Sequence, residues 1–138
     1  MQEERLREFC REIAAQHPGN VFAWTRLVLS YKKMGQYAEL EKAGVHLVKL
    51  NADDAQAWCN LADAYAAQRK YDLAISAYKH ALQLKPNFLN AWNSLGNVFH
   101  TQGRYGEAVE VYLKAVKLNP NDVTPWVWLC LAYTEMGE

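Results

Sequence analysis

Four histidines and three cysteines are the side chains that offer the usual bases, nucleophiles and metal ligands. They are His17, His46, His80, His100, Cys10, Cys59 and Cys130. The histidines fall on three different predicted helices and at one helix end, and no Cys, Asp or Glu lies at ligand spacing from them. The cysteines are odd in number and widely spaced, and Cys59 has no base near it in sequence. We therefore predict a chain that is not an enzyme, with no catalytic residue, no metal site and no cofactor.

Asp53 and Asp54 form a pair of adjacent carboxylates in the middle of the chain. They directly precede a predicted helix, where a carboxylate accepts hydrogen bonds from the exposed amides and favours the helix dipole. Helix capping is thus the better interpretation than acid–base chemistry.

The composition of the chain limits the classes of molecule that it is expected to bind. Fifteen basic side chains balance fifteen acidic ones, whereas a nucleic-acid groove needs a basic excess. No apolar run approaches the ~18 residues of a membrane helix, and the first ten residues lack an apolar signal core. We expect a protein or peptide partner, no nucleic acid, no membrane insertion and a cytoplasmic location.

Tryptophan recurs at a fixed interval along the chain. Trp24, Trp58, Trp92 and Trp126 are spaced 34 residues apart. A leucine follows each tryptophan by three residues, and an aromatic residue follows it by seven. A fixed period of this length indicates stacked supersecondary units, each unable to bury its apolar face alone. We expect these tryptophans to be largely buried in the core.

Each unit contains the pattern of two helices. In residues 89–102, Trp92, Leu95, Gly96 and Phe99 share one helical face, and residues 105–118 carry a second apolar stripe. Gly103 suits the turn between the two, and Pro120 interrupts the second. The pattern predicts an all-α chain with helices at 2–16, 21–34, 37–50, 55–68, 71–84, 89–102, 105–118 and 123–136.

These residues resemble the tetratricopeptide repeat, with its pattern Trp-x2-Leu-Gly-x2-Tyr, Ala-x3-Phe and Pro. The resemblance covers the whole chain. Two units match it almost completely, at Trp58, Leu61, Ala62, Tyr65, Ala74, Tyr78 and Pro86 and at Trp92, Leu95, Gly96, Phe99, Ala108, Tyr112 and Pro120. The resemblance implies a right-handed superhelical solenoid of antiparallel helix pairs.

The same register divides the chain into one domain of repeats, 1–138. We predict a half-repeat at 1–20 (second helix only), whole repeats at 21–54, 55–88 and 89–122, and a half-repeat at 123–138 (first helix only). The repeat at 21–54 departs from the pattern, because Val28, Leu40 and Leu47 replace small residues and Gly44 replaces an aromatic. A glycine inside a helix costs roughly 0.5–1 kcal/mol, so we expect 37–50 to be the least stable helix of the middle.

In the resembled family the first helices line a concave groove that holds an extended peptide. The corresponding outward positions here are polar and mostly uncharged in the second and third repeats. The predicted groove residues are Gln56, Asn60, Asp63, Asn90, Asn93, Asn97 and His100. Asparagine amides can donate to and accept from a peptide backbone, so we expect these amides to be free in the unbound chain. The first repeat offers Phe22, Thr25, Arg26, Leu29, Lys32 and Lys33.

Two relatives within the family can be compared with this groove. A clamp for a C-terminal carboxylate needs a lysine and an asparagine one turn apart, and no repeat has that lysine. The asparagine ladder of O-linked N-acetylglucosamine transferase is matched only by Asn60. The expected role is a scaffold that binds a protein or peptide in a neutral, polar groove.

Two alternative roles stay open. The chain could be the regulatory or substrate-recruiting region of a larger enzyme, or a structural module that self-assembles weakly, head to tail. The second alternative uses apolar residues of the two half-repeats, which would build one composite repeat between molecules. They are Leu6, Phe9, Ile13, Trp126, Trp128, Leu129 and Tyr133.

Overall fold

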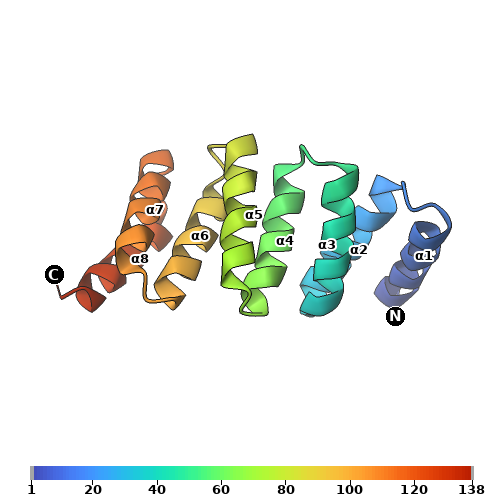
Figure 1. Cartoon of the computed structure of the whole chain (residues 1–138), viewed down its shortest axis with the longest axis horizontal. Coiled ribbons are helices and arrows are strands. Elements are labelled where there is room, and N and C mark those ends of the chain that lie inside the picture. The colour runs from blue at the N-terminus through green and yellow to red at the C-terminus, as the bar shows by residue number, and fades with distance from the viewer. Residues whose placement is uncertain (1, 138) are drawn as a thin grey trace.

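The computed structural model describes residues 2–137, which form eight α-helices and no strand (Figure 1). The helices are α1 (Gln2–Gln16), α2 (Val21–Met34), α3 (Tyr37–Leu50), α4 (Ala55–Ala67), α5 (Tyr71–Leu84), α6 (Leu89–Thr101), α7 (Tyr105–Leu118) and α8 (Val123–Glu135). Every boundary lies within one residue of its predicted position. None of these helices is long and apolar enough to cross a membrane.

The helices stack in chain order along one long axis, with α1 and α8 at opposite ends (Figure 1). Each helix packs against its neighbours in sequence. In addition α2, α4, α6 and α8 contact one another in succession, whereas α1, α3, α5 and α7 do not. The array therefore curves with the even-numbered helices on its concave face and the odd-numbered helices on its convex face.

Short polar side chains start three of the concave helices. Asn20 accepts a hydrogen bond from the amide of Ala23, and Asp122 accepts one from Thr124. Asp54 accepts from both Gln56 and Ala57, which confirms the capping role predicted for this aspartate. These bonds satisfy amides that have no partner inside the helix.

Trp24, Trp58 and Trp92 are mostly buried against the core, as expected, whereas Trp126 is 47% exposed and departs from that expectation. Each indole lies across the turn that precedes its helix and donates its Nε1–H to a carbonyl six residues earlier. For Trp58 and Trp92 the acceptors are Ala52 and Pro86, at 2.9 and 2.8 Å. The rings thus tie each helix to its preceding turn.

The apolar core between the helices contains the exchange of large and small residues predicted for the first whole repeat. Leu40 is fully buried, and Gly44 brings α3 so near α4 that an added methyl would lie 3.2 Å from Leu61. In the third repeat the order is reversed, because Tyr112 is fully buried against Gly96. The division into whole and half-repeats stays a prediction.

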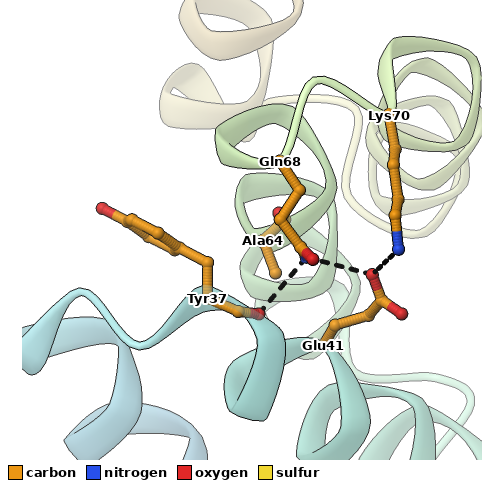
Figure 2. Close-up of polar contacts among 5 residues, drawn as sticks. All are labelled: Tyr37, Glu41, Ala64, Gln68 and Lys70. Atoms are coloured by element: carbon orange, nitrogen blue, oxygen red, sulfur yellow. Dashed lines mark hydrogen bonds and ion pairs between the residues drawn. The ribbon is translucent and has the colours of Figure 1, made fainter.

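A polar clamp joins α3 to the end of α4 (Figure 2). The Gln68 amide donates to the Tyr37 carbonyl and to Glu41 Oε1, and Lys70 pairs with the same Glu41 oxygen at 2.7 Å. The place of Glu41 is taken by Ile75 in the next repeat, so the junction of α5 with α6 lacks the carboxylate of this clamp.

Candidate functional site

All seven predicted groove residues lie on the concave helices. Gln56, Asn60 and Asp63 project from α4, and Asn90, Asn93, Asn97 and His100 project from α6. Their spacing of three, four or seven residues places each set on one helical face. The two sets differ in how far their polar atoms are already bonded within the chain.

The polar side chains of the α4 set are already bonded to a lysine from α2. Asn60 is 3% exposed, and its Oδ1 accepts from Lys32 Nζ at 2.9 Å and from Gln56 Nε2 at 3.0 Å. Lys32 also pairs with Asp63 at 3.1 Å. The prediction of a free amide oxygen was therefore wrong for Asn60. The sequence places Lys32 among the outward positions of the first repeat, but nothing in it shows that this long side chain reaches α4.

Two tyrosines from the convex helices reach through to the concave face. The Tyr78 hydroxyl donates to Asp63 Oδ1, and the Tyr112 hydroxyl donates to Asn97 Oδ1. Burial is the main cause that raises the pKa of both phenols above the ordinary range, and the Asp63 charge adds to it at Tyr78. The Asn97 oxygen is thus also bonded, contrary to prediction.

Some polar groups of the α6 set are not bonded within residues 2–137. Asn93 Oδ1 and His100 Nδ1 are buried atoms without a hydrogen-bond partner in the described residues, and Asn90 is exposed. The His100 ring meets Tyr105 and Trp128 edge to face, with centroids 5.0 and 5.4 Å apart. Because unpaired buried polar atoms are costly, this part of α6 is where a ligand would gain most.

A pocket that the sequence had not indicated lies between α1 and α2. Leu6, Cys10 and Leu29 supply its apolar lining. Its polar lining residues are Glu3, Arg7, Arg26, Ser30 and Lys33. Glu3 is paired with Lys33, which lowers the pKa of Glu3. No carboxylate pairs with the other two cationic side chains of the lining, Arg7 and Arg26, so the pocket is net basic.

The chain offers little for nucleophilic or metal chemistry. Cys59 is buried, and burial followed by the nearby Asp63 charge raises its pKa to about 12. It is therefore a protonated thiol at neutral pH. His46 and His80 stack on Trp24 and Trp58. Residues 2–137 contain no group of three His, Cys, Asp or Glu side chains that could hold a metal.

The residues predicted for an end-to-end contact differ in how far they are exposed to solvent. Leu6, Phe9 and Trp126 are exposed, and Ile13, Trp128 and Tyr133 are half-buried. Leu129 is 3% exposed, because it packs toward α7 as Leu95 packs toward α5, so it cannot take part in such a contact. Trp128 stacks on Tyr112 inside the concave corner, with ring centroids 6.3 Å apart.

A family model of the tetratricopeptide repeat matches this sequence twice, over residues 25–88 and 59–123. The chain belongs to the tetratricopeptide repeat family. Domains of this family are generally non-catalytic interaction modules, and the fold of this chain fits a protein–protein interaction module. A search of curated proteins gives no match.

Solved structures share this tetratricopeptide fold, the right-handed solenoid of helix pairs expected from the sequence. A crystal structure of MamA matches with a TM-score of 0.90 and 24% identity, over 93% of this chain and 75% of that one. The first TPR of Spaghetti (RPAP3), bound to the HSP90 peptide SRMEEVD, matches at 0.81 and 19%, over 86% and 94%. The Arabidopsis OM64 TPR domain matches at 0.79 and 20%, over 83% and 94%.

Proposed function

We propose that the chain is a scaffold that binds an extended segment of a partner protein along its concave face, across α4 and α6. The observation that carries this proposal is the pair of buried, unpartnered atoms on α6, Asn93 Oδ1 and His100 Nδ1. They are seven residues apart on one helix, or about 10 Å at 1.5 Å per residue. That span equals about three residues of an extended peptide, whose backbone amides would meet the two atoms once the Asn93 and His100 side chains rotate outward.

The charge distribution supports a segment that is neutral where it crosses α4 and α6. Lys32 from α2 neutralises Asp63 on α4, and α6 has no formal charge on its concave face. Binding there should depend weakly on salt. The net basic pocket beside α2 would favour an acidic or apolar side chain at one end of the segment. In the similar structure of the Spaghetti TPR, the bound molecule is a peptide.

A double variant and a matched double control test the concave site. Peptides that bind the chain are selected from a random display library, and their affinities are measured by calorimetry. The test variant is Asn90→Ala with Asn93→Ala. The control is Glu110→Ala with Lys117→Ala, which are exposed positions on convex α7. Losing two hydrogen bonds of about 0.5–1.5 kcal/mol each should weaken binding about 5- to 150-fold. An equal loss in the control, or none in the test variant, would reject the groove.

Self-association and a regulatory role within a larger enzyme stay proposals, each supported by fewer observations. Exposure of Leu6, Phe9 and Trp126 supports weak head-to-tail self-association. A regulatory role within a larger enzyme would use the same concave face. The three cysteines are free thiols, which supports a reducing, cytoplasmic setting.

A further inference from the structure

Helices α5 and α7 both pack on α6, but they do not contact one another (Figure 1). A cavity of about 420 Å³ lies between them on the convex side. Its apolar floor includes Trp92, Leu95 and Phe99 of α6. Its charged rim consists of Lys79 on α5 and of Glu107, Glu110 and Lys114 on α7. We call this cavity the convex groove.

The convex groove lies on the opposite side of α6 from the proposed concave site. Trp92, Leu95 and Phe99 are three or four residues apart and share one helical face. Asn93 and Asn97 share another face, which points away from the first because the helix has about 3.6 residues per turn. The two sites therefore do not overlap, and neither proposal depends on the other.

The cover of the Trp92 ring differs from that of the tryptophan one repeat earlier. His80 lies over the Trp58 ring with centroids 4.1 Å apart. The equivalent residue of the third repeat is Lys114, whose Nζ lies 5.0 Å from the Trp92 ring centroid. A cation–π contact at an exposed site is weak, and the flexible stem of a lysine can rotate away from the ring. The Trp92 ring face is therefore covered by a side chain that a ligand can displace.

The far end of the convex groove is closed and neutral. There the Arg104 guanidinium lies 4.8 Å from the Phe99 ring centroid and pairs with Glu107 at 2.8 Å. This arrangement covers the Phe99 ring and cancels the charge of one rim carboxylate. The end of the groove beside Trp92 is thus the part that a ligand can enter.

The Trp92 end carries unpaired positive charge. Lys79 and Lys114 lie in the C-terminal halves of α5 and α7, which antiparallel packing places beside the start of α6 and hence beside Trp92. Neither lysine forms a salt bridge within residues 2–137, and Glu110 is the only rim carboxylate in that range without one. Two ammonium groups against one carboxylate favour an anionic group of the ligand at this end.

The exposure of the rim indicates the kind of ligand. All four charged rim residues are exposed, so the groove is accessible along its length. A small-molecule site buries most of its ligand, whereas an open groove suits a side chain that projects from a larger surface. The indole floor favours an aromatic side chain, because stacked or edge-to-face rings attract one another beyond the area that they bury.

We propose that the convex groove binds an exposed segment of a partner protein that carries an aromatic residue between acidic residues. The aromatic ring replaces the Lys114 side chain on the face of Trp92. The displaced ammonium of Lys114, together with that of Lys79, pairs with the carboxylates that flank the ring. The groove is thus a second protein-binding site, on the side of the solenoid opposite to the concave face.

The probe is the peptide acetyl-Gly-Asp-Phe-Glu-Gly-amide, titrated into the ¹⁵N-labelled chain and followed by NMR. The indole N–H signal of Trp92 is assigned by its loss in Trp92→Phe. This signal and the backbone amide of Lys114 should shift and saturate together. The side-chain amide signals of Asn93 and Asn97, on the other side of α6, should stay in place.

Variants of the peptide test its two chemical features. Replacing its phenylalanine by alanine should abolish the shifts. Replacing its two carboxylates by the corresponding amides should weaken binding about 2- to 30-fold, the factor expected for two exposed ion pairs. Phenylacetate, which has a ring and one carboxylate but no peptide chain, should bind more weakly than the peptide.

Variants of the chain locate the site. Lys79→Ala with Lys114→Ala should weaken peptide binding by the same factor of about 2 to 30. The matched control is Lys42→Ala with Lys49→Ala, which removes two exposed lysines of convex α3 and should leave binding unchanged. Gln83→Trp should block the groove from its exposed rim, whereas Leu113→Trp, at an exposed position outside the groove, should not.

Four results would overturn the proposal. The Trp92 signal could fail to shift, or the lysine variant and its control could lose affinity equally, which would indicate non-specific charge attraction. The Asn93 and Asn97 amides could shift in place of Trp92, which would put the peptide on the concave face. Phenylacetate could bind as tightly as the peptide, which would make a small aromatic anion, rather than a protein segment, the ligand.

Discussion

The Tyr112 hydroxyl donates a hydrogen bond to Asn97, which lies fifteen residues earlier on the neighbouring concave helix. Tyr78 makes the same bond to Asp63 one repeat before. In the first whole repeat the corresponding pair is Gly44 and Leu29, and Leu29 is exposed on the concave face. A tyrosine on the convex helix thus accompanies a polar residue on the concave helix, and the bond fixes that polar side chain where a ligand would meet it.

The first prediction separates these two bonds by the charge of the acceptor. Tyr112→Phe removes a bond to a neutral amide and should lower the free energy of unfolding by about 0.5–1.5 kcal/mol. Tyr78→Phe removes a bond to a carboxylate and should cost about 1.5–3 kcal/mol. Urea unfolding monitored by circular dichroism measures both. Asp63→Asn should narrow the gap, and equal losses in the two single variants would contradict the assignment.

The second prediction concerns two glycines with opposite surroundings. A methyl group on Gly96 would lie 2.5 Å from Cε1 of the buried Tyr112, whereas a methyl on Gly106 in α7 would meet nothing within 4 Å. Gly96→Ala should therefore destabilise the chain by about 1–3 kcal/mol through overpacking. Gly106→Ala should stabilise it by up to about 1 kcal/mol through helix propensity. The thermal unfolding midpoints should move in opposite directions, and a shared direction would contradict this account of α6 and α7 packing.

The fold could be predicted almost completely from the sequence, because the tryptophan spacing and the turn residues act locally. Each helix contains its own apolar stripe, and Asp54 caps α4 through amides only two and three residues away. For the candidate site, the sequence predicted which helical faces form it but not which of its side chains bond to one another. Lys32 meets Asn60 across 28 residues of sequence, and only the packing of α2 on α4 decides that contact. The bond from each indole to its preceding turn was missed for a similar reason, since an apolar period does not show that an indole ring will lie on a turn.

The third prediction follows from the turn between α4 and α5. Arg69 has φ 62°, in the left-handed region, where Gly35 and Gly103 stand in the neighbouring repeats with φ 71° and 77°. The left-handed conformation destabilises a residue with a Cβ by roughly 1–2 kcal/mol, and glycine avoids this cost. Glycine also makes the unfolded chain more flexible, which offsets about 0.4–1 kcal/mol of that gain. Arg69→Gly should therefore raise the free energy of unfolding by roughly 0.5–1 kcal/mol. The reciprocal Gly103→Arg should lower it, and chemical denaturation that shows no such reciprocity would count against the turn geometry.

The fourth prediction uses the three free thiols, of which Cys130 alone is exposed. A thiol reagent at about pH 8 should titrate one cysteine in the folded chain and all three after denaturation. Cys59 should be protected most strongly, since burial raises its pKa from 9.0 to about 12. A Cys130→Ala chain that still reacts rapidly would show that Cys10 or Cys59 is open.

The same raised pKa of Cys59 makes stability fall at alkaline pH. The unfolded chain loses this proton near its ordinary pKa of 9.0, whereas the folded chain keeps it until about pH 12. The contribution is therefore fully present below about pH 9 and is lost as the pH rises to about 12. Tyr78 and Tyr112 act with the same sign, because burial raises the pKa of each above its ordinary 10.0. Urea midpoints measured across this range should fall less steeply for Cys59→Ala than for the parent chain, and Cys130→Ala should follow the parent. Identical slopes for Cys59→Ala and Cys130→Ala would mean that the Cys59 thiol is solvated in the folded state.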